Sequence, residues 1–221
     1  MDFNDFNPGA IIVVVVSLAL APFVAVMVTS FTKIVIVLSL LRNALGLQQV
    51  PPNVVLNGLA IILSIYVMYP VLTETYDSVN SQIAAMSGEE NDLEKILELA
   101  NEGKVPLQKF LHKHSDPNER EFFLNTINKI MNQKQTDIVS ETDLLVVIPA
   151  FVVSELTDAF QIGFLIYLPF LIIDLIVSNI LLALGMMMLS PTTISLPFKL
   201  LLFVFINGWT HLIHGLIMTY L

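Results

Sequence analysis

The sequence predicts an all-α fold in which membrane-associated helical hairpins flank a helical soluble insertion. Three observations predict this class. Hydrophobic residues make up 55% of the 221 residues and charged residues only 13%, and the mean hydropathy is +0.77, as is typical of membrane proteins. Long apolar blocks lie toward both ends of the chain. Between them, residues 73–143 hold 14 of the 19 acidic residues and 7 of the 10 basic ones.

We therefore expect three parts: N-terminal apolar helices over 1–72, an acidic helical extracytoplasmic segment over 73–143, and C-terminal apolar helices over 144–221. The net charge of −9 and the lack of a basic cluster argue against a nucleic-acid partner. The chain contains no cysteine, which excludes disulfides and thiolate chemistry.

The first part contains two uncharged runs of 19 residues, 10–28 and 54–72, each close to the roughly 20 residues that cross a bilayer as a helix. Its acidic start, MDFNDFNPG, lacks the basic region of a signal peptide, so we expect it to be retained. The connection that carries Arg42 and the later one that carries Lys199 contain no acid, which favours the cytoplasmic side for both. The acidic segment is then expected on the opposite side.

The middle segment has the apolar spacing of helices. In NDLEKILELANEG (91–103) apolar residues recur at 93, 96, 97 and 100, and in REFFLNTINKIMNQ (120–133) Phe123, Ile127 and Ile130 share a face. Asp116 before Pro117 predicts a turn ahead of the second helix. The histidines of HKH (112–114) are expected to be solvated.

The last part begins with a 46-residue apolar block, 144–189, that is too long for one crossing and too interrupted for two. Gly185 and Pro191 both favour a helix break around Met186, Met187 and Met188. Methionine is flexible and re-packs when its neighbours move, and an irregular loop at membrane depth is tolerated where it lines a cavity or is buried in protein. This pattern favours a loop that projects into a pore, with packing in a core or against lipid as the alternative.

Five charged residues lie in or beside the apolar blocks: Lys33, Glu155, Asp158, Asp174 and Lys199. Each would cost roughly 2.5–3.5 kcal/mol at mid-bilayer. We therefore expect Lys33 and Lys199 to form assembly salt bridges with Glu155 and Asp174, within or between subunits. Glu155 and Asp158 are like charges on one helix face, which is unfavourable unless a cation lies between them. The alternative is an ion or proton relay through the three carboxylates.

A pore lined by such apolar helices needs several copies of the chain around an axis. Four glycines offer close-approach points for helix packing: Gly46, Gly58, Gly163 and Gly185. His211 and His214 are three residues apart but have no further ligand in their block, so no metal is expected. The sequence has no nucleophile elbow, P-loop or zinc motif, and we expect neither catalysis nor a cofactor.

Three long stretches carry a resemblance to a known family: TSFTKIVIVLSLLRNALGLQQVPPN (29–53), PAFVVSELTDAFQIGFLIYLPFLIIDL (149–175) and ALGMMMLSPTTISLPFKLLLFV (183–204). Through them the chain resembles the FliP/SctR export-gate proteins of bacterial type III secretion systems. The lack of a signal peptide is closer to the injectisome branch than to the flagellar one.

This resemblance implies a homopentamer in the bacterial inner membrane, joined by four copies of a small two-helix subunit and one larger homologous subunit. Unfolded secreted proteins would cross this gate, and the soluble segment would be periplasmic. It further implies that many apolar helices are bent hairpins held above the membrane plane, with the buried charges in protein contacts. In it, Met186, Met187 and Met188 would form a gasket that closes the channel.

Two positions depart from the family pattern. Members commonly carry Asp-Gly-Trp where this chain has Asn207, Gly208 and Trp209, and Asp158 stands where relatives often carry a basic or polar residue. Two other functions remain open: a secondary transporter or proton channel that uses Glu155, Asp158 and Asp174, and a scaffold whose partners make the pore.

Overall fold

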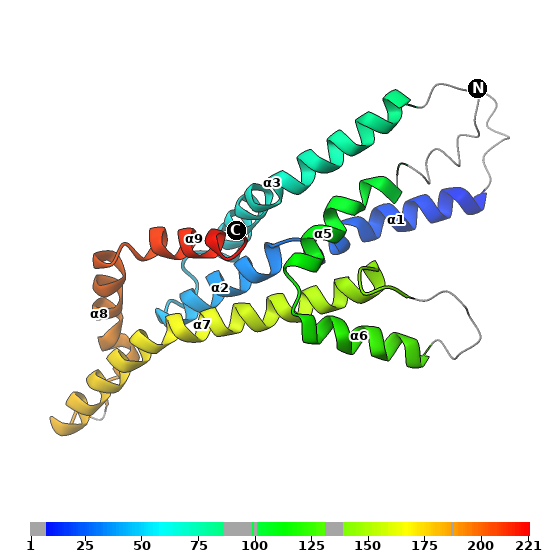
Figure 1. Ribbon diagram of the computed structural model, residues 1–221. Helices are drawn as coiled ribbons and strands as arrows, with labels where there is room; N and C mark the ends of the chain where they lie inside the picture. The colour runs from blue at the N-terminus through cyan, green and yellow to red at the C-terminus, as the bar shows by residue number, and fades with distance from the viewer. Residues whose placement is uncertain (1–7, 86–98, 100, 131–138, 187) are drawn as a thin grey trace.

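The computed structural model describes residues 8–85, 99, 101–130, 139–186 and 188–221. Helices form all the regular structure in this part of the chain, and no strand occurs within it, so the predicted all-α class is confirmed. The helices, shown in Figure 1, are α1 (Pro8–Met27), α2 (Phe31–Ala44), α3 (Asn53–Ala85), α5 (Val105–Lys113), α6 (Pro117–Ile130), α7 (Leu144–Ala183), α8 (Pro191–Phe205) and α9 (Gly208–Met218).

Two helices, Asn53–Ile83 within α3 and α7, are long and apolar enough to cross a membrane. Two further pairs of helices are long and apolar enough to cross a membrane when the two members of a pair are taken together. Each pair bends by 62° at a short break: Leu18–Met27 with α2, and α8 with α9. By length and composition the described residues therefore hold two spans, or up to four if each bent pair counts as one. The apolar blocks of the sequence correspond to these helices.

The block expected from the sequence to be too long for one crossing and too interrupted for two forms a single 40-residue helix, α7. It runs unbroken through Pro149 and Pro169. At 1.5 Å per residue it is about 60 Å long, twice the roughly 30 Å of a hydrocarbon core. Figure 1 shows α7 extending from the middle of the molecule to the tip where it turns into α8.

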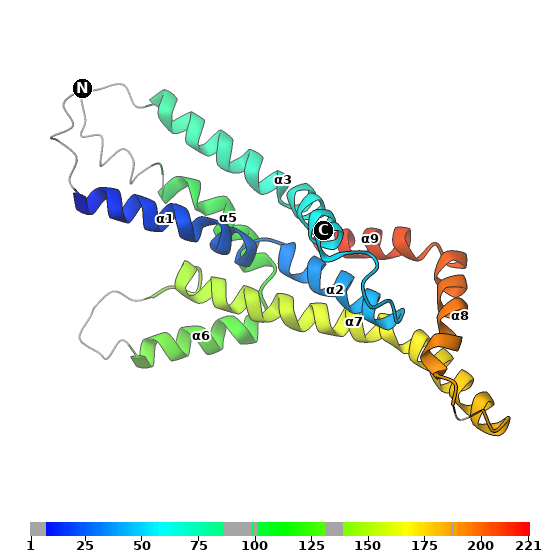
Figure 2. The same cartoon turned by 180° about the vertical axis from the view of Figure 1, so that it is seen from behind.

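The core forms around α2, which packs between α3 and α7. Its buried residues Ile34, Val37, Leu38 and Leu41 recur at the spacing of one helix face. Seen from behind (Figure 2), α2 lies along α7, and α9 returns toward this core, where Leu216 joins the same cluster. The bent C-terminal pair thus folds back onto the first half of the chain.

The acidic middle is continuous with the apolar parts in the structure. Helix α3 passes residues 72 and 73 without a break, α5 packs against α3 and α7, and α6 packs against α7. The helix predicted near 120–133 is confirmed as α6 up to Ile130. Most of the helix predicted over 91–103 lies outside the described residues, and the domain boundaries remain predictions.

Much apolar surface is uncovered in the single chain. Ile62 on α3, Phe164 on α7 and Val204 on α8 expose 66%, 63% and 73% of their side chains. Exposed apolar surface on this scale marks contact with lipid or with other protein.

Gly163 is one of the four glycines expected at close approaches between helices, and the structure shows such an approach there. A Cβ added there would lie 2.2 Å from Cδ1 of Leu40 on α2, whereas at Gly58 it would meet nothing within 4 Å. The absence of a side chain at Gly163 lets α7 approach α2. Gly58 faces open space in the single chain, so a close approach there stays a prediction for the oligomer.

We predict that Gly163→Ala destabilises the protein by about 1–3 kcal/mol because it overpacks the α2–α7 contact. Thermal unfolding of the detergent-solubilised protein measures the change. The matched control is Gly58→Ala, which adds the same methyl group in open space and should melt no lower than wild type. Equal melting temperatures for the two variants would contradict this account of the α2–α7 contact.

Candidate functional site

The centre of the molecule holds a buried ion cluster around Lys33. This side chain, 2% exposed on α2, places its Nζ 2.8 Å from Oε1 of Glu155 and 3.0 Å from Oδ2 of Asp158. Glu155 is fully buried, while Asp158 is half exposed. Both carboxylates come from consecutive turns of α7, so Lys33 is the cation that lies between these like charges.

Tyr220, which follows α9, completes the cluster. Its hydroxyl donates a hydrogen bond to Oε2 of Glu155, and its ring centroid lies 4.5 Å from Nζ of Lys33. A cation over an aromatic face is attracted by the ring quadrupole. Lys33 is therefore surrounded by two carboxylates and a ring, and the buried Glu155 has a hydrogen-bond donor as well as a counter-ion.

His114, at the end of α5, packs against this cluster. Its ring lies 4.7 Å from that of Phe110 and 5.2 Å from that of Tyr220, centroid to centroid. Burial, assisted by the charges of Lys113 and Lys33, lowers the pKa of His114 to about 4. The side chain is consequently neutral at pH 7 and half-buried, so the expectation of a solvated histidine is wrong at this position.

A second buried ion pair joins α7 to α8. Nζ of Lys199 lies 2.6 Å from Oδ2 of Asp174 and donates a hydrogen bond to the carbonyl oxygen of Ala44, 3.1 Å away at the end of α2. The hydroxyl of Ser195 donates to the other oxygen of Asp174. Lys199 is 3% exposed, so its charge is satisfied within the protein.

Both ion pairs form within one chain, and Asp174 is kept apart from Glu155 and Asp158, which share Lys33. Glu155 and Asp174 are 19 positions apart on the continuous helix α7, a rise of about 28 Å. Each is bound by its own lysine. The geometry therefore shows two separate ion clusters and does not assemble the chain of titratable groups that a relay requires. Whether the pairs also govern assembly stays a prediction.

The methionine loop forms the tip of the molecule. Gly185 has φ +72°, and the N–H groups of Gly185 and Met186 bond back to the carbonyls of Leu182 and Leu181, which ends α7 in a Schellman motif. Helix α8 then begins at Pro191. Met186 is 48% exposed and Met188 is fully exposed; Met187 lies outside the described residues. Figure 1 shows this connection at the end farthest from α6.

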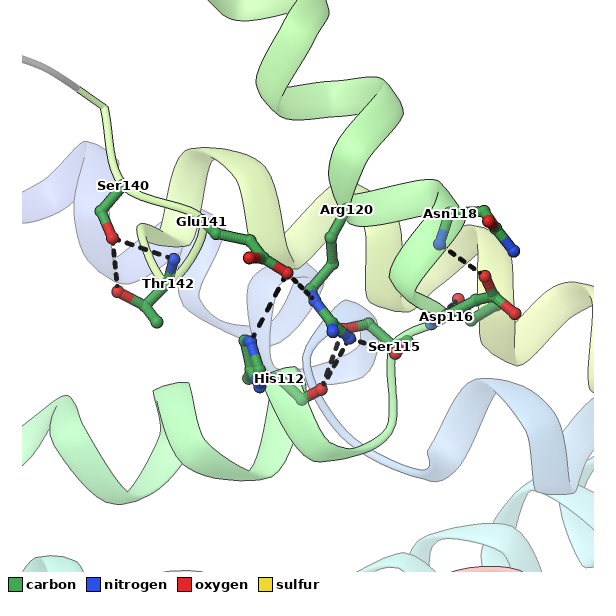
Figure 3. Close-up of polar contacts among 9 residues, drawn as sticks. His112, Ser115, Asp116, Asn118, Arg120, Ser140, Glu141 and Thr142 are labelled. Carbon is green, nitrogen blue, oxygen red and sulfur yellow. Dashed lines mark hydrogen bonds and ion pairs between the residues drawn. The ribbon is translucent and has the colours of Figure 1, made fainter.

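A third polar cluster, drawn in Figure 3, holds the start of α6. The guanidinium of Arg120 points back into the turn after α5, where Nε donates to Glu141, 2.8 Å away, and Nη1 to the carbonyl oxygens of His112 and Ser115. The hydrogen bond from Arg120 lowers the pKa of the exposed Glu141. This cluster ties the α5–α6 turn to the residues before α7, and no spacing in the sequence predicts it.

Other predicted residues lie apart from these clusters. His211 and His214 are exposed on α9, and within the described ranges no three His, Asp or Glu side chains converge as metal ligands would. The sequence did not point to several cluster members, among them Tyr220, Arg120 and Ser195, nor to the place of His114 in a cluster.

We predict that Lys33→Met destabilises the protein by about 3–5 kcal/mol because it leaves Glu155 buried without its counter-ion. Adding Glu155→Gln should recover part of the loss, since it removes the unpaired charge. The control is Asp158→Asn. Because the carboxylate of Asp158 is half exposed, we expect this change to lower the free energy of unfolding by about 1 kcal/mol or less. Thermal unfolding in detergent compares the four proteins, and a Lys33→Met variant as stable as Asp158→Asn would contradict the assignment.

Comparison with known proteins gives the family of the chain. The model of the FliP family matches residues 14–216. The chain is 50% identical over 210 residues to Yop proteins translocation protein R of Yersinia pestis, covering 95% of each chain. It is 47% identical over 212 residues to hypersensitivity response secretion protein HrcR of Ralstonia nicotianae, covering 96% of this chain and 97% of that one.

A third relative, virulence protein YscR of Salmonella typhimurium, is 46% identical over 206 residues and covers 92% of each chain. The three relatives are named for translocation, secretion and virulence. The similarity extends through α2, α7 and α8, where the two ion pairs and the methionine loop lie. The resemblance seen in the sequence is thereby confirmed, and the chain belongs to the FliP family.

Proposed function

We propose that this protein is a core subunit of a type III secretion export apparatus. It forms an oligomeric gate through which unfolded proteins are exported across the bacterial inner membrane. The observation that carries the proposal is the match to the FliP family along residues 14–216, which includes the exposed methionine loop. The relatives named for secretion and translocation support the same role.

The working form is a ring, for which the resemblance to the family implies a homopentamer. The uncovered apolar faces of α3, α7 and α8 support an oligomer, as does an apolar groove of about 590 Å³ between α7 and the α8–α9 pair. A small two-helix export subunit and a larger homologous subunit complete the assembly. Lipid covers the apolar faces that remain.

In this ring the methionine loops are the gasket. Five copies bring fifteen thioether side chains to one axis, and each has three rotatable bonds. Such side chains fill an irregular gap at rest and part around a passing chain. β-branched residues, which are stiff at the first side-chain torsion, would fit a single shape.

The protein acts as a conduit and not as an enzyme, and it uses neither a metal nor a cofactor. It is a multi-pass protein of the inner membrane, with residues 73–143 on the periplasmic side. The connection that carries Arg42 then faces the cytoplasm, in accordance with the excess of basic residues on that side. Lys199, expected from the sequence in a second basic connection, lies buried within α8 and pairs with Asp174, so it does not support this orientation.

We predict that replacing Met186, Met187 and Met188 together by alanine raises the resting small-ion conductance of the complex severalfold, because alanine cannot fill the constriction. Conductance of the purified complex in planar bilayers is the measurement. The control is Met218→Ala, which removes another exposed methionine, on α9, and should leave the conductance unchanged. No leak in the triple variant would favour the scaffold reading, in which partners make the pore.

We further predict that Lys199→Asp impairs assembly, because it places two like charges against each other at a largely buried site where losing one partner costs about 3–5 kcal/mol. Co-reversal with Asp174→Lys should restore part of the assembled complex, measured by size-exclusion chromatography. The exposed Lys109→Asp serves as the control for a simple change of net charge. Absence of any rescue would argue against the pairing as the basis of assembly.

A further inference from the structure

Tyr220 lies just beyond α9, at the end of the α8–α9 hairpin, yet it is buried against other elements of the chain. Tyr220 is 6% exposed and contacts three other elements of the chain. Its hydroxyl donates to Glu155 on α7, and its ring lies over the ammonium group of Lys33 on α2. The third element is α5, which belongs to the middle segment, 73–143. The proposed gate has so far given that segment no role.

The contacts with α5 are made by Phe110 and Lys113 of the helix and by His114, the residue that follows it. The rings of Phe110 and Tyr220 stack at 6.2 Å with 15° between their planes, and His114 meets Tyr220 edge-on at 5.2 Å. Nζ of Lys113 donates to the backbone carbonyl oxygen of Leu221, 3.3 Å away. The end of α9 is therefore held by α5 through stacking, an edge contact and a hydrogen bond.

The other end of α9 is a sharp bend. Asn207 sits between α8 and α9 with φ 51° and ψ 46°, in the left-handed region that asparagine tolerates better than most residues, and the two helices bend there by 62°. Helix α8 is in turn fixed to α7 by the Lys199–Asp174 pair, about 16 Å along α7 from the loop that begins at Gly185. Helix α9 thus links the α5 contact to the hairpin that carries the methionines.

We propose that Tyr220 is a positioning residue for the gate: it latches the end of α9 to α5 and α7, so that the middle segment holds the α7–α8 hairpin in its resting position. The proposal rests on the proposed function, since it assigns a control point to that gate. Opening requires the latch to release. A partner acting on α5 can then bias the gate without touching the methionine loop.

The first test distinguishes the contribution of the Tyr220 hydroxyl from that of its ring. Tyr220→Phe keeps the stacking on Phe110 and the face presented to Lys33, but it removes the donor to Glu155. We expect the assembled complex to form and its resting conductance to rise about tenfold or more. A tenfold change corresponds to about 1.4 kcal/mol, close to what a hydrogen bond to a charged group contributes.

A merely structural tyrosine would lower the yield or the melting temperature of the complex without changing the conductance of each assembled pore. Normal conductance in assembled Tyr220→Phe complexes therefore overturns the latch. Phe110→Leu, which removes the stacking partner on α5 but leaves Glu155 and its hydrogen bond intact, is expected to leak as well. If it does not, α5 has no part in holding the gate.

The second test leaves Tyr220, Glu155, Lys33 and Phe110 unchanged and removes only the hydrogen bond from Lys113 to Leu221. The chain has no cysteine, so Lys113→Cys with Leu221→Cys introduces a single pair of thiols at the exposed edge of the latch. A short, cleavable bismaleimide added after assembly would tie α5 to the end of α9. We expect secretion to stop in the linked complex and to resume when the linker is cleaved, whereas continued secretion by the linked complex would overturn the proposal.

The triple methionine-to-alanine variant separates this inference from the function on which it rests. If that variant leaks but the latch variants do not, the gate stands and the latch fails. If neither the triple variant nor the latch variants leak, the methionine gate itself fails.

Discussion

A buried lysine must be neutralised where it lies, and this requirement at Lys33 organises the first half of the fold. An ammonium group without a partner is not tolerated in an apolar interior. Its partners come from α7 and from the residue after α9. Three segments that are distant in the sequence are thereby held at one point. One apolar cluster forms around α2, and a second one contains Tyr220 together with residues of α5 and α7.

The same solution recurs at Lys199 and Asp174, but there it serves the hairpin that carries the methionines. Between the two clusters α7 is a continuous helix with an apolar surface that the single chain leaves largely uncovered. The buried charges are thus paired within the chain, whereas much of its apolar surface is left exposed. This division suits a subunit whose polar contacts fix its own shape and whose apolar faces are reserved for lipid and neighbouring subunits.

Apolar run length and helical spacing were sufficient to predict the all-α class and α6, and Gly185 with Pro191 predicted the break after α7, because these features depend on neighbouring residues. The sequence also named Lys33, Glu155, Asp174 and Lys199 as partners, because a charge in an apolar block needs one, but it left open whether they pair within a chain. It did not identify Tyr220, His114 or Arg120. Tyr220 bonds to a residue 65 positions away, and no local pattern encodes such a contact. The continuity of α7 through two prolines likewise depends on packing against α2, α6 and α8.

The central claim is that this chain builds a ring with other subunits of an export apparatus, and native mass spectrometry tests it most directly. The protein would be purified in detergent, alone and after co-expression with the small two-helix subunit and the larger homologous subunit. The account predicts a homopentamer that gains both kinds of subunit on co-expression. A monomer or dimer that recruits neither would contradict it, because no axis would then bring the methionine loops together.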